Sequence, residues 1–189
     1  MNQLELAFTE FGFSEKHVIT ISTLFKLKQY KRGDYFLQDG KLGEYIGFVN
    51  SGMFQFYVDT DSAEITTYIA FRNDFILSIQ CYFAGKPSKE NIKALVDSEV
   101  CVIRKVDFKH LIETIGGFKE FYIKVLENLL TCLDESRFDY ITLKPEERYL
   151  KLLTEEPELL QQVPLKYLSA LIGVTPRHLS RIRKGIQKE

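Results

Sequence analysis

The sequence predicts an α+β protein with three parts: an N-terminal antiparallel β-roll of the jelly-roll kind, a long helix, and a C-terminal all-α helix-turn-helix. Short β-branched and aromatic runs, separated by turn signals, fill residues 24–104. After Asp107 the apolar spacing becomes helical, and two short helices with a glycine between them follow Pro164. We therefore expect a β-roll over residues 1–112, one helix over 113–141 and a helix-turn-helix domain over 142–189.

The composition is that of an ordinary globular protein. Hydrophobic residues make up 45% of the 189 residues, and charged residues make up 27%. No run of about 20 uncharged apolar residues occurs, and acidic residues stand in the N-terminal segment where a signal peptide would be basic. We therefore expect a cytoplasmic protein that has no membrane partner.

The cysteines and histidines are scattered along the chain. Cys81, Cys101 and Cys132 are odd in number and widely spaced, which is untypical of a disulfide framework or of a CxxC metal site. The three histidines form no HxxxH or HxH pair. We expect buried free thiols and no metal centre. An enzyme on a cupin-like barrel would also lack the ligand set or acid–base pair that it needs.

The first part of the chain has the regularly spaced turn signals of a β-protein. Turn signals recur every 8 to 12 residues or so, which indicates many short antiparallel strands and hence a barrel or jelly roll. Residues 54–58 and 65–69 each alternate between two sets of side chains, which predicts two half-buried strands joined by a hairpin. One set is Phe54, Phe56 and Val58 in the first run and Ile65, Thr67 and Ile69 in the second.

A helical repeat follows the β-rich part. Six side chains recur at spacings of 4, 3, 4, 3 and 4, and no proline stands between Asp107 and Lys144, which predicts one long helix. Such a stripe can pack against its own β-domain or form the seam between two protomers, and the spacing alone leaves both interpretations open. The six residues are Phe118, Tyr122, Val125, Leu129, Cys132 and Ser136.

Three further helices are expected after residue 144. Pro145 suits the first turn of a helix over residues 148–156, which Pro157 would end. A second helix covers residues 164–172. Gly173 makes a turn, and a third helix begins with Thr175 as N-cap, continues from Pro176 and stops at Gly185. Steeply crossing helices need a small residue at their contact and apolar residues that fix the angle. These residues are Ser169 with Leu168, Ile172, Val174, Leu179 and Ile182.

The last helix predicts a nucleic-acid-binding face. From residue 162 to 189, six basic residues and one acidic residue give a net charge of +5, which leaves −6 on the rest of a chain whose total is −1. A helical projection with Leu179 and Ile182 inward turns one basic face outward. Such a face suits the DNA major groove, although a solvated basic surface is the alternative. Arg177, Ser180, Arg181 and Lys184 lie on this face, and His178 and Arg183 flank it.

The order of these features resembles the Crp/Fnr family of transcription regulators over nearly the whole chain. Residues 31–34, 39–40 and 48–52 are similar to the family's opening turns and to a strand that ends in Ser-Gly. Residues 92–100 are similar to the late β-roll segment, and residues 175–184 to the recognition helix. The resemblance implies a β-roll sensor, a dimerisation helix, double-stranded DNA as ligand, a homodimer, and RNA polymerase as a further partner.

Two departures from the family pattern change these expectations. Arg177 stands where the family commonly has a glutamate, and an arginine cannot accept a hydrogen bond from cytosine N4, so the operator should differ. The chain also leaves no room for a β-hairpin wing after the last helix.

The family's nucleotide cassette falls on residues 73–94, where its glutamate, arginine and serine become Ser78, Ser88 and Lys89. The resemblance therefore predicts no cofactor and no binding of cyclic AMP in the family manner. A pocket for a more apolar effector, or for none, would be lined by Phe75, Ile76, Leu77 and Ile79.

These observations favour the function of a homodimeric DNA-binding transcription regulator that is not an enzyme. Two-fold operators suit a helix-turn-helix dimer. This favours the interpretation of the apolar stripe as a seam between two protomers and not as a helix packed on its own β-domain. The alternative is a ligand-binding or signalling module whose C-terminal helices bind a protein, and the basic face speaks against it.

Overall fold

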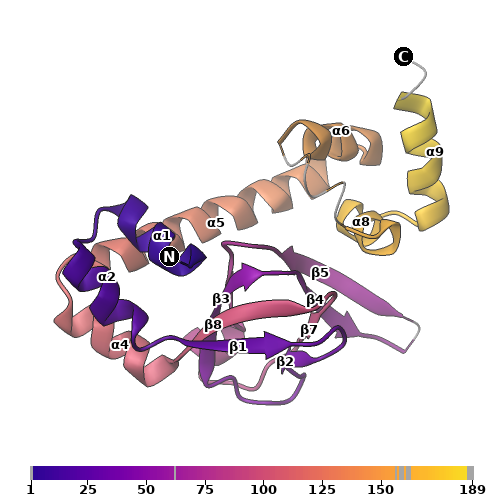
Figure 1. Ribbon diagram of the computed structural model, residues 1–189. Coiled ribbons are helices and arrows are strands. Elements are labelled where there is room, and N and C mark those ends of the chain that lie inside the picture. The colour runs from indigo at the N-terminus through magenta and orange to yellow at the C-terminus, as the bar shows by residue number, and fades with distance from the viewer. Residues whose placement is uncertain (1, 62, 156, 158–159, 161–162, 187–189) are drawn as a thin grey trace. The chain divides into compact units, whose positions relative to one another are not determined.

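The computed structural model describes residues 2–61, 63–155, 157, 160 and 163–186 and divides into two compact units, Met1–Lys124 and Val125–Glu189. Antiparallel sheets are followed by helices (Figure 1), so the predicted α+β class is confirmed. The first unit begins with α1 (Gln3–Phe11) and α2 (Glu15–Ser22). Asn2 caps α1 in a capping box with Glu5, whose side chain returns a bond to the Asn2 backbone.

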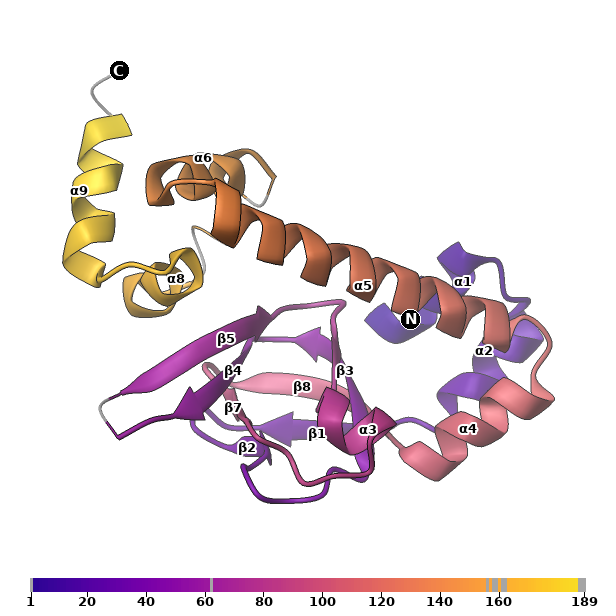
Figure 2. The ribbon, with the colours of Figure 1, turned by 180° about the vertical axis from the view of Figure 1, so that it is seen from behind.

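Among the described residues, eight antiparallel strands form the β-roll as two four-stranded sheets, with orders β1-β8-β3-β6 and β2-β7-β4-β5. The short helix α3 (Ile79–Phe83), which Figure 2 labels, follows β6 and precedes β7 in the chain. The strands are β1 (Lys26–Tyr30), β2 (Tyr35–Leu37), β3 (Tyr45–Ser51), β4 (Phe54–Asp59), β5 (Glu64–Ala70), β6 (Phe75–Ile76), β7 (Asn91–Ala94) and β8 (Ser98–Arg104).

The predicted hairpin exists as β4 and β5, but a bulge interrupts the regular alternation that was expected of β5. A register shift at Phe56/Tyr57 leaves one extra residue in β5 and puts Ile69 opposite Gln55, on the face away from Phe54. A bulge of one residue reverses the faces of all side chains beyond it, which is why alternation alone could not place Ile69. The strand β4 is also buried on both faces, because Gln55 is only 1% exposed.

Apolar side chains from both sheets fill the space between them. Phe54 and Phe56 of β4 meet Val100 of β8 and Ile76 of β6 in one buried cluster. Gly47 in β3 permits the close approach, since a Cβ there would lie 2.7 Å from side-chain atoms of Ile76 and Val100.

The expected long helix over residues 113–141 is present as α5, but it begins later than expected. Helix α4 (Lys105–Thr114) ends before a turn at Ile115–Gly117, and α5 (Phe118–Thr142) begins after it. Gly117 has a left-handed φ of 83°, which breaks the helix where no proline was present to signal it. Phe118 is completely buried against Phe108 and Phe8, so it belongs to the protomer's own core and offers no surface to a second copy.

The second unit contains the C-terminal part of α5 together with α6 (Pro145–Glu155), α8 (Leu165–Ile172) and α9 (Pro176–Ile186). Pro145 and Pro176 are the first helical residues, as predicted. The expected stop at Gly185 is wrong, because this glycine has no left-handed φ and α9 continues to Ile186. Residues 156, 162, 188 and 189, which entered the expected helix or the charge count, lie outside the described residues.

Candidate nucleic-acid interface

The turn between α8 and α9 has the geometry that the sequence predicts. Gly173 has a left-handed φ of 77°, and its N–H donates to the Ala170 carbonyl at 3.0 Å. The next N–H, of Val174, donates to the Ser169 carbonyl at 2.9 Å, so both bonds close the end of α8. The Thr175 hydroxyl accepts from the His178 N–H at 3.2 Å and caps the start of α9.

Buried side chains fix the two helices to each other. Leu168 and Ile172 of α8, together with Leu179 and Ile182 of α9, are buried. Ser169 is also buried, and its hydroxyl donates to the Lys166 carbonyl at 2.8 Å, so the small polar side chain is satisfied within α8. Leu179 and Ile182 lie three residues apart on one face of α9, which orients the opposite face toward solvent.

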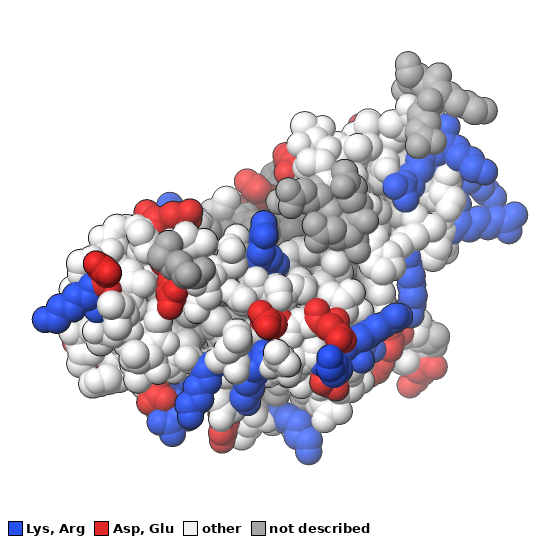
Figure 3. Space-filling view, in the orientation of Figure 1, with Lys and Arg blue, Asp and Glu red and all other residues white. Residues whose placement is uncertain are grey.

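The outward face of α9 is cationic. Arg177, Arg181 and Lys184 are exposed, and none of them makes a hydrogen bond or ion pair with another residue that the structure describes. Lysine and arginine side chains gather over α9 (Figure 3). The helix contains no acidic residue, and Arg183 is half-buried at the edge of the face. Three unpaired cations on one helix face form a surface suited to a polyanion.

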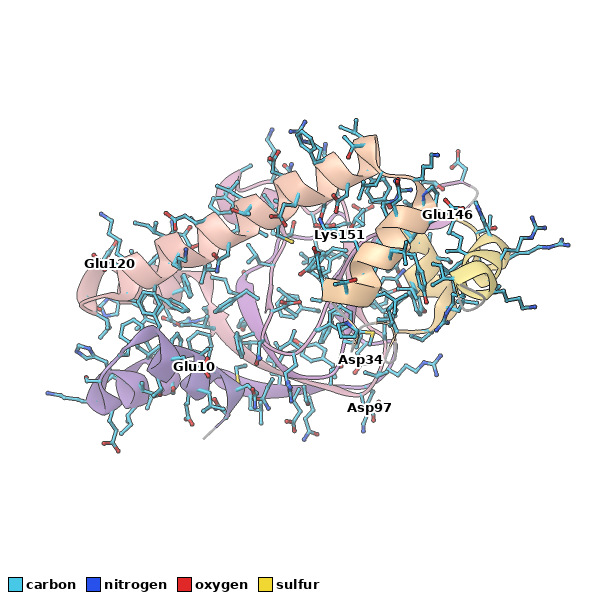
Figure 4. All side chains as sticks on the ribbon, turned by 90° about the horizontal axis from the view of Figure 1, so that it is seen from above. Glu10, Asp34, Asp97, Glu120, Glu146 and Lys151 are labelled. Carbon is cyan, nitrogen blue, oxygen red and sulfur yellow. The ribbon has the colours of Figure 1, made fainter. Side chains whose placement is uncertain are left out.

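Two of the predicted face residues have other partners. The hydroxyl of Ser180 donates to the Pro176 carbonyl at 3.0 Å and is therefore engaged within its own helix. His178 Nε2 lies 3.6 Å from Oε1 of Glu146, a residue of α6 that is labelled in Figure 4. This imidazole therefore points toward a neighbouring helix. The structure thus brings Arg177, Arg181 and Lys184 together and directs His178 away from them.

The cassette serines are occupied by local hydrogen bonds. Ser78 is buried and caps α3, since its hydroxyl accepts from the Cys81 N–H at 3.4 Å. Ser88 is buried as well, and its hydroxyl donates to the Glu90 carbonyl at 2.7 Å and accepts from the Glu90 N–H at 3.2 Å. Lys89 is exposed. Burial raises the pKa of the Glu90 carboxyl, an effect that the hydrogen bond from Thr67 opposes.

The apolar residues predicted to line an effector pocket do not converge on one space. Phe75 and Ile76 are neighbours in β6 and therefore point to opposite faces of the sheet. Ile76 lies in the core between the sheets, whereas the Phe75 ring packs on Phe48 and Phe121. Leu77 is half-buried, and Ile79 is 43% exposed on α3. The expected lining of one pocket is therefore divided among three environments.

Sequence reasoning missed two residues that hold the helix-turn-helix. Tyr140 of α5 and Arg148 of α6 both donate hydrogen bonds to the last carbonyls of α8. No local pattern could have found them, because the contact joins three helices that are separated in the sequence. Within the described part of the chain, no three metal-binding side chains gather, and no helix is long and apolar enough to cross a membrane.

Comparisons with known proteins agree with this architecture. Residues 27–115 match the model of the cyclic nucleotide-binding domain family. A comparison with curated protein sequences finds no match. Among solved structures, a CooA mutant from Carboxydothermus hydrogenoformans is 16% identical with a TM-score of 0.73, covering 100% of this chain and 85% of that one.

Two further solved structures are similar. CLP from Xanthomonas campestris, a c-di-GMP-responsive global regulator, is 15% identical with a TM-score of 0.70 over 93% of this chain and 92% of its own. A protein from Eubacterium rectale assigned to the Crp/Fnr family of transcriptional regulators is 16% identical with a TM-score of 0.67 over 93% and 84%.

Residues 27–115 are therefore similar to the cyclic nucleotide-binding domain family. The chain as a whole has the fold of Crp/Fnr regulators, which confirms the resemblance that its motifs indicated.

Proposed function

We propose that this protein is a homodimeric, sequence-specific DNA-binding transcription regulator whose β-roll does not bind cyclic AMP in the family manner. The observation that carries the proposal is the cationic outward face of α9, presented by a capped and internally packed helix-turn-helix. Such a regulator would act in the bacterial cytoplasm and would meet RNA polymerase at its target promoters.

The charge of the helix-turn-helix supports DNA as the ligand. Between residues 163 and 186 the chain contains no aspartate or glutamate. Arg177 and Arg181 are unpaired among the described residues, and both can offer a planar donor fork to the O6 and N7 atoms of guanine. Lys184, one turn further on, can neutralise a phosphate. A protein partner would instead call for an apolar patch on α9, whose two buried apolar residues, Leu179 and Ile182, are occupied by the packing of the unit.

The exposed side of α5 supports a homodimer. Leu130 is 66% exposed and Ile141 is 72% exposed, and Ile123 and Leu133 also lie on the surface. At about 100° per residue these four share one face of the helix. Of the predicted seam, Tyr122, Val125 and Leu129 are half-buried, whereas Cys132 and Ser136 are exposed. We place the contact with a second copy on the exposed apolar stripe and its Leu129 border, because an apolar stripe along a helix is stable in water only when it is covered.

The chemistry of the cassette supports a sensor that does not bind a cyclic phosphate. A buried phosphate needs a fixed cation and oriented donors, since an unpaired buried charge is costly. Ser78 and Ser88 supply no charge, and both hydroxyls already have backbone partners. The half-buried charged group nearest to Ser88 in the sequence is the Glu90 carboxyl, which would repel a phosphate.

The proposal is tested by selecting bound sequences from a random double-stranded DNA library with the purified protein. Enrichment of a two-fold sequence, lost in Arg181→Ala and kept in Arg104→Ala, is the expected result. Arg104 is a matched control, because it is an exposed arginine of the first unit that is paired with Asp107. A library without any enriched sequence would contradict the proposal and would favour a protein partner for the C-terminal helices.

A further inference from the structure

The C-terminal end of α8 is held by side chains from outside the helix-turn-helix. The Tyr140 hydroxyl of α5 donates to the Leu171 carbonyl at 2.8 Å and to the Ala170 carbonyl at 3.3 Å. Arg148 of α6 donates to the Ile172 carbonyl from Nη2 at 2.8 Å and from Nε at 3.1 Å. The last carbonyls of a helix have no donor within it, so these two side chains satisfy the end of α8.

The same arginine also holds the end of α5. Arg148 Nη1 donates to the Leu143 carbonyl at 2.8 Å, and its guanidinium stacks over the Tyr140 ring at 4.7 Å from the centroid. Two helix C-termini, each with a partial negative charge, therefore converge on one cation. The planar guanidinium can bond both ends at once, whereas a lysine ammonium is a single point on a flexible stem.

Two more contacts complete this arrangement. The Tyr140 ring lies against the turn of the helix-turn-helix, since a Cβ on Gly173 would come within 3.0 Å of it. Lys151 of α6, whose position Figure 4 labels, pairs with Asp139 of α5 at 2.7 Å. We call Asp139, Tyr140, Arg148 and Lys151 the clamp. It joins the last turns of α5 to the turn that precedes α9.

We propose that the clamp sets the direction of α9 relative to α5 and thereby selects the spacing between the two half-sites that the dimer accepts. This inference rests on the proposed function, since it needs a DNA-binding homodimer joined along α5. Helices α8 and α9 form one packed body, so whatever orients α8 also orients α9. Directional hydrogen bonds fix a rotation that apolar contact would leave adjustable.

The geometry makes spacing a sensitive readout. A rotation of about 20° about a lever of about 10 Å, the usual distance between packed helix axes, moves a helix by about 3.5 Å. That displacement is close to one base-pair step, which is about 3.4 Å along the DNA axis. A loosened clamp should therefore let the dimer accept spacings that differ by one base pair.

Tyr140 and Arg148 act as positioning residues, because their polar atoms are spent on protein carbonyls and are not free to meet a base. Their loss should change which spacing is bound and leave the preferred sequence within each half-site unchanged. Plain destabilisation of the unit would instead weaken every spacing equally. The spacing profile therefore separates a positioning role from a merely structural one.

The test compares wild type, Tyr140→Phe and Arg148→Lys by selection from random duplex DNA, followed by gel-shift titration of operators whose spacers differ by one base pair. In wild type one spacing should dominate. In both variants the affinity ratio between the best spacer and its neighbour should fall by at least about threefold, since each variant loses one or more directional bonds. The conservative change Arg104→Lys, at an exposed ion pair of the first unit, is the matched control and should keep the ratio.

The outcomes are distinguishable. Wild-type protein that selects no paired half-sites would overturn the DNA-binding dimer itself, and the spacing inference with it. Wild-type protein with a sharp preference that both variants retain would overturn the clamp alone, as would a changed half-site sequence in the variants. Thermal melting checks that each variant is folded. If Arg148→Lys does not fold, Tyr140→Phe alone decides, because it removes only one hydroxyl.

Discussion

Replacing Arg181 with alanine should weaken sequence-specific binding and leave the fold intact. Arg181 is exposed and has no partner among the described residues, so its truncation should change the free energy of unfolding by no more than about 0.5 kcal/mol. A bidentate contact between arginine and guanine is worth about 1 to 3 kcal/mol of discrimination. At about 1.4 kcal/mol per factor of ten, affinity should fall about 5- to 150-fold for each half-site that loses its contact.

Lys184→Ala is the contrasting variant. A lysine that meets phosphate contributes equally to all sequences, so this variant should weaken operator and unrelated DNA alike and lower the salt slope by about one for each protomer, or about two for the dimer. Gel-shift titrations of both variants at several salt concentrations, on operator and on scrambled DNA, separate the two roles. If both substitutions left operator affinity unchanged, or if Arg181→Ala weakened operator and scrambled DNA equally, the assignment of base reading to Arg181 would be wrong.

Four further outcomes are expected. Leu130→Glu on the exposed stripe of α5 should give a monomer by light scattering at micromolar concentration. The control Thr131→Glu, on another side of the helix, should remain a dimer. An intact dimer in both variants would argue against the α5 interface. Gly173→Ala should lower the free energy of unfolding in urea by about 1 to 2 kcal/mol, because its left-handed φ of 77° is costly for alanine. Gly185→Ala should raise it by about 0.5 to 1 kcal/mol, because it lies in open space within α9. Isothermal titration with cyclic AMP and cyclic GMP should show no saturable micromolar binding. Saturable micromolar binding of either nucleotide would refute the interpretation of the cassette residues. Burial raises the pKa of Glu90, so the folded state loses stability as pH rises from the ordinary glutamate pKa through the raised one. Glu90→Gln should therefore have a higher melting temperature than wild type at neutral pH and the same melting temperature in acid. Equal melting temperatures of variant and wild type at both pH values would contradict this expectation.

The features that sequence reasoning predicted well are those fixed by neighbours along the chain. Thr175, Pro176 and Gly173 mark the helix-turn-helix because caps and left-handed turns depend on single residue types. The buried positions Leu168 and Leu179 follow from helical periodicity, and both are fully buried. Such local rules carry over directly from sequence to structure.

The features that it missed depend on contacts between distant segments or on backbone detail. The break before α5 lies at Gly116-Gly117, where the run without proline gave no signal of it. In β5 a single bulge reversed the side of Ile69. Phe75 and Ile76 were grouped as one pocket because they are adjacent, although adjacency in a strand places them on opposite faces. The hydrogen bonds of Tyr140 to α8 have no signature in either segment.

The residue types on α9 also restrict the DNA that it can read. Arginine and lysine only donate hydrogen bonds, and α9 contains no carboxylate or amide side chain that could accept one. In the major groove guanine presents two acceptors, whereas cytosine presents a donor, so direct reading by these cations must rest on acceptor atoms and favours guanine. Arg177 and Arg181 are four residues apart, about 6 Å along the helix axis, which matches about two base-pair steps. We therefore expect each selected half-site to contain two guanines about two steps apart, on either strand, and Arg177→Glu to replace the preference for one of them by cytosine, since a carboxylate accepts from its N4 amine.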